Sequence, residues 1–283
     1  MNPRSDAPSR SDPLRDIRGT IVLVGAGKMG SALLEGWLAL GLAPNKLAVI
    51  EPQPNNDIAA LAALGLRLNP PQPLDDEIAA VVIAVKPQVA PEVMPTLSPV
   101  VRTETVVVSI MAGRTLRFLD AALPHVALVR AMPNTPAAVG RGITVAVPNV
   151  RVSEAQRDLV HALLSAVGAV EWICDEGLMD AVTALSGSGP AYVFLLAETM
   201  ARAGCAAGLP PLLAEALARA TVAGSGELLH RSPLAAATLR QNVTSPGGTT
   251  AAALDVLMAK DGLQELMTKA IAAAAKRSHE LAG

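Results

Sequence analysis

The stretch "TIVLVGAGKMGSALLEGWLALG", residues 20–41, decides the fold of the first half of the chain. It passes from an apolar run to helical periodicity across Gly25, Gly27 and Gly30. A strand, a glycine turn and a helix are the context that a dinucleotide-binding motif requires. In that motif Gly25 makes the tight turn, Gly27 lets the backbone approach a pyrophosphate, and Gly30 lets helix and strand pack closely. Since glycine turns also occur without a ligand, the neighbouring strands matter to the interpretation.

A carboxylate follows the next strand. The segment "KLAVIEP" (46–52) ends its apolar run at Glu51, 21 residues after Gly30. This is close to the ~20 expected for an acidic residue that reaches the adenosine ribose. A carboxylate there accepts hydrogen bonds from the ribose hydroxyls and repels a 2′-phosphate, and "PQPNND" (52–57) offers no Arg or Lys for that phosphate. Glu51 therefore favours NADH over NADPH. The alternative is a solvated Glu at a strand end.

Three more strand-like runs follow, each apolar and rich in β-branched residues: "AAVVIAVKP" (79–87), "TVVVSIMAG" (105–113) and "VALVRAMPNTP" (126–136). Such runs are typical of a parallel sheet that is covered on both faces. Ligands of doubly wound sheets bind where the strands end. We expect an α/β fold that begins with a Rossmann-type doubly wound domain at residues 19–150, after a disordered tail at residues 1–18.

The second half, residues 151–283, is expected to be all helical. The β-strand signals stop after "GRGITVAVPN" (140–149), and Ser153 with Gln156 forms a capping-box pattern at the next helix start. The stretch 190–210 is apolar almost all round, so it should form a helix that is buried on most sides. A helical domain of this size offers too few partners for such a helix, which predicts dimerisation through this half.

Two segments interrupt the helical pattern, "DAVTALSGSGPAY" (180–192) and "NVTSPGGTTAAALDVL" (242–257). Both place hydroxyl residues and glycines directly ahead of a helix. A helix start of this kind can bind a carboxylate through backbone N–H groups and hydroxyls, without a basic side chain. The alternative is an elaborate cap between helices. We expect a small-molecule acid as substrate, with Thr183 and Ser186 among the site residues.

The bulk composition excludes several classes of function. The formal net charge is −2 and no long basic run occurs, so neither a nucleic acid nor an anionic membrane is an expected partner. No apolar stretch is long enough to span a membrane. The first residues lack the apolar centre of a signal peptide, which predicts a cytoplasmic location. Two distant cysteines and four scattered histidines indicate neither a disulfide framework nor a metal site.

Seven motifs then occur in one order: "VGAGKMGSALLEGW", "AVKPQ", "SIMAG", "RAMPNTPAAVGRG", "DAVTALSGSGPAYVF", "AGCAAGLP" and "VTSPGGTTAAALDVL". Together they resemble the Δ1-pyrroline-5-carboxylate reductase family. The stretch from Asp180 to Thr250 is similar to the signature region of that family. The resemblance implies reduction of a cyclic imine to L-proline, the last step of proline biosynthesis, by hydride from NADH or NADPH. It also implies a helical C-terminal domain that interlocks with its twofold mate in a homodimer, with further assembly of dimers common.

The resemblance also implies site residues. Those that match the cofactor site are Gly25, Gly27, Lys28 and Met29 in the pyrophosphate loop, Ala84, Val85, Lys86 and Pro87 beside the cofactor, and Ala112 and Asn134 near the nicotinamide. Those that match the substrate site are Thr183 near the substrate nitrogen and, from the partner subunit, Gly247, Gly248, Thr249 and Thr250 around the carboxylate. The chain departs from the family in "HRSPLAAATLRQ" (230–241), which lacks an acidic residue, and at Glu51, where many members have hydroxyl or amide residues.

The residue types agree with imine reduction. Hydride transfer to a protonated imine depends on positioning and a dry pocket more than on a strong acid, and no His, Cys or Glu stands out as a catalytic centre. We expect Thr183 to hydrogen-bond the ring nitrogen, with a water as the proton source. Lys86 is an alternative acid, although a Lys before Pro at a strand end is more often a cofactor or structural contact.

Three other functions stay open at this point. A β-hydroxy-acid dehydrogenase needs a Lys in its helical domain, whereas Lys260, Lys269 and Lys276 lie outside the glycine and hydroxyl motifs. A reductase for the six-membered imine differs by one methylene, a discrimination of only about 1–3 kcal/mol. A nucleotide-binding sensor without turnover would not need a carboxylate site, so the two glycine and hydroxyl segments argue against it.

Overall fold

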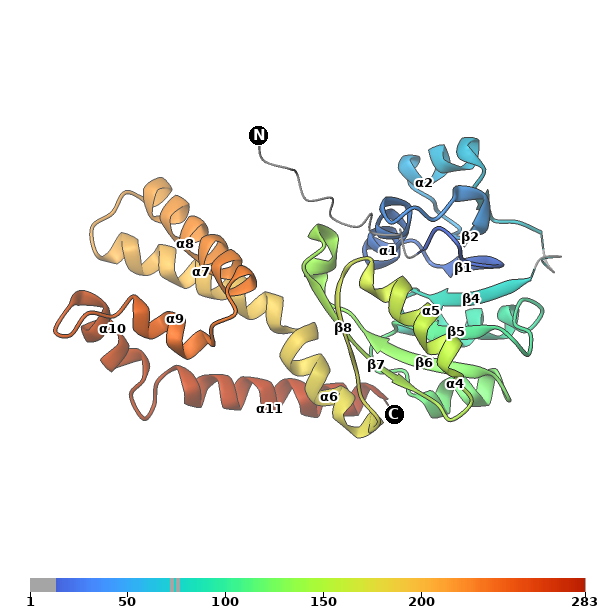
Figure 1. The fold of residues 1–283 in the computed structure, drawn as a ribbon. Helices are drawn as coiled ribbons and strands as arrows, with labels where there is room; N and C mark the ends of the chain where they lie inside the picture. Colours follow the sequence, from blue (N-terminus) through green and yellow to red (C-terminus); the bar gives the residue numbers. More distant parts are fainter. Residues whose placement is uncertain (1–13, 72–73, 75–76, 283) are drawn as a thin grey trace, which may run out of the picture. The chain divides into compact units, whose positions relative to one another are not determined.

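The chain divides into two compact units. The computed structural model describes residues 14–71, 74 and 77–282 (Figure 1). Of these, the residues up to 187 form the first unit together with residues 277–282, and residues 188–276 form the second. The strands all lie in the first unit and the second is helical, which confirms the expected class of a Rossmann-type domain followed by a helical domain.

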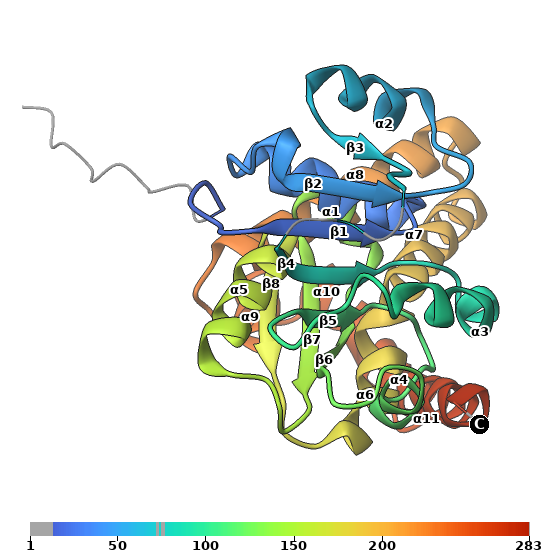
Figure 2. The ribbon, with the colours of Figure 1, turned by 90° about the vertical axis from the view of Figure 1, so that its right-hand side faces the viewer.

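An eight-stranded sheet forms the centre of the first unit, in the order β3-β2-β1-β4-β5-β6-β7-β8 (Figure 2). Neighbouring strands are parallel except for the antiparallel pair β6–β7. The strands are β1 (Thr20–Val24), β2 (Leu47–Ile50), β3 (Arg67–Leu68), β4 (Ile78–Ile83), β5 (Val106–Ser109), β6 (Ala127–Met132), β7 (Gly142–Pro148) and β8 (Gly168–Trp172). The chain order reverses between β1 and β4, and doubly wound folds bind nucleotides at such a reversal.

Helices cover both faces of this sheet. They are α1 (Lys28–Ala39), α2 (Asn56–Leu61), α3 (Ala90–Val93), α4 (Leu116–Ala122), α5 (Glu154–Ser165) and α6 (Met179–Val182). On one face, Trp37 of α1 is fully buried and donates a hydrogen bond from Nε1 to the Leu163 carbonyl of α5, 2.8 Å away. On the other face, Met94, Leu97 and Leu119 pack against the strands. Coverage of both faces explains why the central strands are apolar along their whole length.

Side chains cap three of these helices. Asn55 accepts a hydrogen bond from the backbone N–H three residues on, at the start of α2, and Thr115 does the same for α4. At α5 the Ser153 hydroxyl accepts from the Gln156 N–H while the Gln156 side chain accepts from the Ser153 N–H. The predicted capping box is therefore confirmed.

The prediction that β structure ends near residue 149 is wrong. Residues Gly168–Trp172 form β8, which pairs in parallel with β7, so α5 and β8 extend the first unit to Gly187 rather than to residue 150. The strand lies at the sheet edge and its residues alternate between half-buried and exposed. A short "GAVEW" with this alternation and a charged residue gives no apolar run, which is why the sequence pattern did not reveal it.

The prediction of a disordered tail at residues 1–18 is wrong for residues 14–18, which the structure describes. Leu14 is completely buried in the core and Ile17 packs against it. The Ile17 carbonyl also accepts a hydrogen bond from the Lys46 ammonium at 2.5 Å. The part of the prediction that concerns residues 1–13 falls outside the described residues.

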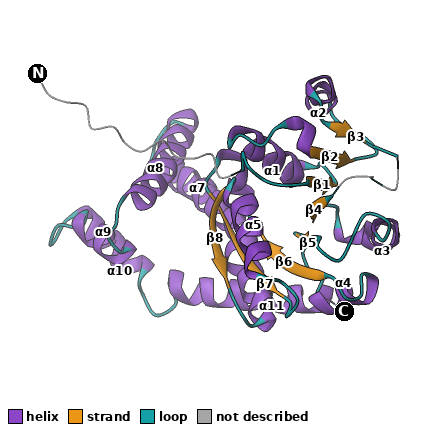
Figure 3. Cartoon of the chain, turned by 45° about the vertical axis from the view of Figure 1, so that its right-hand side comes forward, coloured by secondary structure: helices purple, strands orange, loops and turns teal. Residues whose placement is uncertain are grey.

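The second unit, all of whose residues are described, consists of helices joined by short loops and contains no strand (Figure 3). They are α7 (Gly189–Ala206), α8 (Pro211–Arg231), α9 (Ala236–Asn242), α10 (Thr249–Leu257) and α11 (Leu263–Ala282), the last of which ends in the first unit. The sequence analysis was wrong to expect a break at 180–192, because α6, a π-helical turn at Thr183–Gly187 and α7 follow one another almost without interruption.

The helices of the second unit expose large apolar side chains. The whole of α7 is described and buries no residue within the chain, and Phe194 on it is 68% exposed. Leu212 and Leu217 of α8 and Val256 of α10 are also exposed. The expectation that α7 is buried on most sides is therefore not met by one chain alone. None of the described helices combines the length and apolar character that crossing a lipid bilayer requires.

Candidate active site

The loops that follow β1, β2, β4 and β5 lie side by side at one edge of the sheet. Backbone hydrogen bonds continue past the strand ends, from the Gly25 N–H to the Ile50 carbonyl at 2.9 Å and from the Ala84 N–H to the Val24 carbonyl at 2.7 Å. The Ile110 N–H donates to the Ile83 carbonyl at 3.0 Å. This edge therefore brings together the segments in which the sequence analysis placed the cofactor residues.

The glycine loop has the geometry that its motif predicts. Gly25 has a φ of +88°, and a Cβ there would lie 2.9 Å from the Ala84 carbonyl carbon. A Cβ on Gly30 would lie 2.3 Å from the Gly25 carbonyl oxygen. At Gly27, the N-cap of α1, a Cβ would meet no described atom within 4 Å, and no side-chain hydrogen bond caps the helix. Two glycines are thus needed by the fold, while Gly27 leaves the helix start open for phosphate oxygens.

Alanine substitutions are expected to separate these roles. Gly30→Ala should lower the free energy of unfolding by about 1–3 kcal/mol, because backbone atoms must move to admit the methyl group. Gly27→Ala should unfold at the wild-type temperature yet bind the dinucleotide about tenfold more weakly, because its methyl group occupies only the ligand's space. Thermal unfolding and titration of cofactor fluorescence measure the two effects. An equal loss of stability in both variants would contradict the assignment of Gly30 to packing and of Gly27 to ligand binding.

Glu51 lies directly beside the glycine loop. Its Oε2 accepts a hydrogen bond from the Ala26 N–H at 2.8 Å, and its Oε1 accepts from the Gln53 N–H at 3.0 Å. The Asn69 side chain exchanges two hydrogen bonds with the Glu51 backbone, both at 2.9 Å. The carboxylate is therefore fixed next to the loop that would carry the pyrophosphate, at the end of β2. The sequence analysis did not find Asn69, which follows the two-residue strand β3.

Arg114 joins two of the loops. Its guanidinium donates from Nε and Nη2 to the Pro87 carbonyl, at 3.1 and 2.7 Å, and stacks over the Phe118 ring at 4.6 Å from the centroid. It thus fixes the segment after β4, which contains Lys86, to the segment after β5, which contains Ala112. Both Lys86 and Ala112 are exposed. Arg114 was not among the predicted site residues, although it directly follows the "SIMAG" motif.

Asn134 connects the end of β6 to the π-helical turn. Its Nδ2 donates to the Ser186 carbonyl at 3.2 Å, and its Oδ1 accepts from the Ile143 N–H at 2.9 Å. A Cβ on Gly187 would lie 2.6 Å from the Met132 side chain, so this turn also packs closely on the strand. The Asn134 amide is therefore hydrogen-bonded to the protein backbone through both its nitrogen and its oxygen, and its expected place near the nicotinamide stays a prediction.

Thr183 begins the π-helical turn Thr183–Gly187. Its hydroxyl donates to the Met179 carbonyl at 2.8 Å, and the Ser186 hydroxyl donates to the Val182 carbonyl at 3.0 Å. Each hydroxyl proton is thereby donated to a backbone carbonyl, while the lone pairs of the hydroxyl oxygen can still accept a hydrogen bond. Thr183 and Ser186 are both half-buried. π-Helical turns are rare and occur frequently at functional sites.

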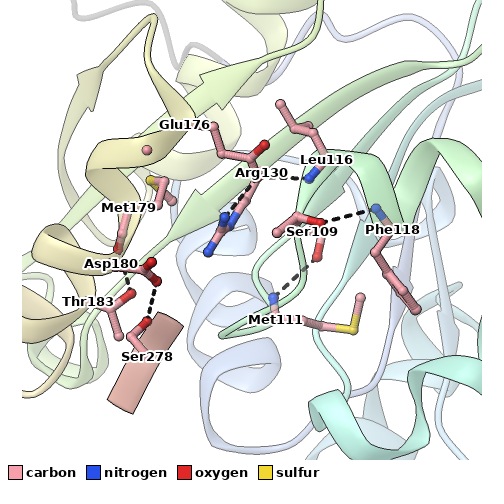
Figure 4. Close-up of polar contacts among 12 residues, drawn as sticks. Ser109, Met111, Leu116, Phe118, Arg130, Glu176, Met179, Asp180, Thr183 and Ser278 are labelled. Carbon is pink, nitrogen blue, oxygen red and sulfur yellow. Dashed lines mark hydrogen bonds and ion pairs between the residues drawn. The ribbon is translucent and has the colours of Figure 1, made fainter. Parts of the chain in front are cut away.

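An ion pair between a buried arginine and a half-buried glutamate lies close to the Thr183 turn (Figure 4). Arg130 of β6, only 4% exposed, donates to Glu176 Oε1 at 2.8 Å, and the same oxygen accepts from the Leu116 N–H at the start of α4. Arg130 and Glu176 line a cavity of about 340 Å³ together with Asp180 and His279. In the described part of the chain no group of His, Cys, Asp or Glu is arranged to hold a metal ion.

The second unit carries the other predicted substrate residues. Gly247 has a φ of +67°, and the Gly248 N–H donates to the Ser245 carbonyl at 3.0 Å. Gly248 is the N-cap of α10, where no side-chain hydrogen bond satisfies the first N–H groups, and Thr249 and Thr250 form its first turn. This helix start is open and flanked by hydroxyls, as a carboxylate site requires.

Both halves of the chain match known proteins. Residues 176–281 match a family model described as pyrroline-5-carboxylate reductase dimerisation, and residues 20–113 match one described as NADP oxidoreductase, coenzyme F420-dependent. The pyrroline-5-carboxylate reductase from Synechocystis is 40% identical to this chain, over 92% of this chain and 97% of the relative. The pyrroline-5-carboxylate reductase from Pseudomonas aeruginosa is 39% identical, over 93% of this chain and 96% of the relative.

Solved structures agree with these sequence matches. A pyrroline-5-carboxylate reductase from Coxiella burnetii is 34% identical, with a TM-score of 0.84 over 94% of this chain and 99% of its own. The Plasmodium falciparum pyrroline carboxylate reductase, solved with NADP bound, is 28% identical, with a TM-score of 0.76 over 95% of this chain and 100% of its own.

Proposed function

The chain belongs to the pyrroline-5-carboxylate reductase family, and from this premise we propose that it reduces Δ1-pyrroline-5-carboxylate to L-proline with a reduced nicotinamide dinucleotide. The observation that carries this function is the position of Thr183. Its π-helical turn is tied by Asn134 to the end of β6, at the edge of the sheet that also bears the glycine loop. Thr183, whose hydroxyl can form a hydrogen bond with an imine nitrogen, is thus held at the same edge of the sheet as the dinucleotide loop.

The dinucleotide would be held by the residues at the strand ends. The open start of α1 at Gly27 suits the pyrophosphate, and Glu51 suits the adenosine ribose. The exposed Lys86 and Ala112 belong to the loops that Arg114 fixes together. When bound, the reduced nicotinamide supplies the hydride that reduces the imine carbon.

The protein's own contribution to the chemistry is placement and hydrogen bonding. The Thr183 proton is donated to the Met179 carbonyl, so its oxygen can accept a hydrogen bond from the N–H of the protonated ring nitrogen. This interaction orients the imine and stabilises its positive charge without a proton transfer from the enzyme. The substrate reaches the site already protonated, with water as the proton source, and no ionisable side chain is needed as a strong acid.

NADH is the cofactor that Glu51 favours. The carboxylate is fixed by the Ala26 and Gln53 N–H groups, so it cannot easily turn away from a 2′-phosphate. The Plasmodium falciparum relative was solved with NADP bound, and family membership alone therefore does not decide the preference. The local charge at the end of β2 is the basis for proposing NADH.

The functional molecule that we propose is a homodimer, whose dimers can assemble further. The second unit exposes Phe194, Leu212 and other large apolar side chains that one chain leaves uncovered, and it matches a dimerisation family model. In such a dimer, the partner's loop at residues 247–250 would hold the substrate carboxylate. The cytoplasmic location remains a prediction from the sequence.

Steady-state oxidation of NADH and NADPH tests the function. With Δ1-pyrroline-5-carboxylate the enzyme should oxidise cofactor and release L-proline, and the six-membered imine homologue should react with a lower kcat/KM. A higher kcat/KM for the six-membered ring would make that compound the substrate. Cofactor binding without turnover of either compound would identify a nucleotide-binding sensor instead.

A further inference from the structure

The last residues of α11 return to the first unit and contact the helix that leads to Thr183. Residues 277–282 belong to this unit by contact, although the rest of α11 belongs to the other. Ser278 is only 5% exposed, and its hydroxyl donates to Asp180 Oδ1 at 2.7 Å (Figure 4). His279 Nδ1 lies 3.3 Å from the second oxygen of the same carboxylate.

Asp180 is in a position to influence Thr183. It lies in α6 (Met179–Val182), and the Thr183 hydroxyl donates to the carbonyl of Met179, the neighbour of Asp180. The Ser278–Asp180 hydrogen bond therefore fixes the single helical turn that orients the Thr183 side chain. The Ser278 hydroxyl is buried, and a hydrogen bond to a charged acceptor is shorter and stronger than one to a neutral acceptor.

The same end of α11 also touches the cofactor side of the site. Gly113 follows Ala112 in the loop after β5, and a Cβ on Gly113 would lie 3.4 Å from the Leu281 carbonyl oxygen. One helical turn thus contacts both the segment proposed to lie near the nicotinamide and the segment that carries Thr183.

We propose that Asp180 and Ser278 are positioning residues for the reduction: the end of α11 holds the Thr183 turn in register with the nicotinamide loop. The proposal rests on the proposed function, which places Thr183 at the ring nitrogen. Loss of the hydrogen bond should leave both ligands bound but misplace them relative to each other. Small misplacements of this kind reduce the rate of reaction more than they reduce binding.

Kinetics of alanine variants test the proposal. Ser278→Ala and Asp180→Ala should each lower kcat about tenfold, with an unchanged dissociation constant for NADH. Asp180→Asn keeps an oxygen that can accept from Ser278, and it should recover most of the loss. Arg277→Ala is the matched control, because it removes only the exposed ion pair with Glu280 in the same helical turn, and its kcat should equal that of the wild type.

A double-mutant cycle with Thr183→Ala separates positioning from a merely structural role. If Ser278 acts through Thr183, adding Ser278→Ala to Thr183→Ala should change the residual kcat by less than about twofold. Unchanged kcat in the single variants, losses that multiply in the double variant, or an Asp180→Asn enzyme as slow as Asp180→Ala would each overturn the proposal. A wild-type enzyme inactive on the imine would instead overturn the proposed function.

Discussion

Replacing Thr183 by alanine is expected to lower kcat/KM for Δ1-pyrroline-5-carboxylate about 100-fold. The Thr183 oxygen has its own proton committed to the Met179 carbonyl at 2.8 Å, so its lone pair is free to accept from the protonated imine. This hydrogen bond orients the imine and favours its protonated, reactive form, and removing one such positioned hydrogen-bonding group typically costs this much in rate. The wild-type NADH dissociation constant should be retained, because the loss concerns the substrate.

Two further variants control this experiment. Thr183→Ser keeps the hydroxyl and should retain most of the activity. Thr268→Ala removes a hydroxyl that donates in the same way to the carbonyl four residues earlier, at 2.8 Å from the Gln264 oxygen, on the exposed surface of α11. It should behave as the wild type. If Thr183→Ala reduces the imine at the wild-type rate, the ring nitrogen is bound by another group.

Replacing Glu51 by alanine is expected to shift the NADH-to-NADPH ratio of kcat/KM toward NADPH by about 10- to 100-fold. The substitution removes hydrogen bonds to the ribose hydroxyls and the repulsion of a 2′-phosphate. It also removes the hydrogen-bond acceptor of the Ala26 N–H in the glycine loop. Part of the decrease in kcat/KM with NADH should therefore also occur with NADPH.

Glu51→Gln separates the two effects. The amide can still accept from the Ala26 N–H but carries no charge, so the loop should stay in place while the repulsion disappears. We therefore expect NADPH turnover to rise in this variant and NADH turnover to fall only moderately. Measured kcat/KM values for both cofactors decide the matter. A wild type that prefers NADPH, and keeps that preference in both variants, would refute the role given to Glu51.

Much of the first unit could be predicted from the sequence because its local patterns are strong. The apolar runs that contain β1, β4, β5 and β6 are each followed by a glycine or a proline, and the glycine spacing specifies the first strand–loop–helix unit. The order of motifs then indicated the family, which the comparisons establish. Local patterns of this kind need only neighbouring residues to be read correctly.

The parts that could not be predicted depend on contacts between distant residues. The edge strand β8 is stabilised by pairing with β7, which no run of apolar residues announces. The segment 180–192 appears broken in sequence because its glycines and hydroxyls disfavour a helix, yet the Asn134–Ser186 and Asp180–Ser278 hydrogen bonds hold it in helical turns. Both contacts join residues that lie about 50 to 100 positions apart.

The helix α7 illustrates a different limit. Its apolar residues indicated burial, and the single chain exposes them. The pattern records the total apolar surface that has to be covered, but it does not say whether the same chain or a second copy covers it.

Isotope labelling shows directly whether the enzyme transfers a hydride from NADH to the imine carbon. Purified enzyme would be incubated with Δ1-pyrroline-5-carboxylate and NADH that carries deuterium at the transferable position of C4, and the product examined by mass spectrometry and NMR. We expect L-proline with deuterium on the ring carbon that was double-bonded to nitrogen. Proline without deuterium, or no proline at all, would contradict it.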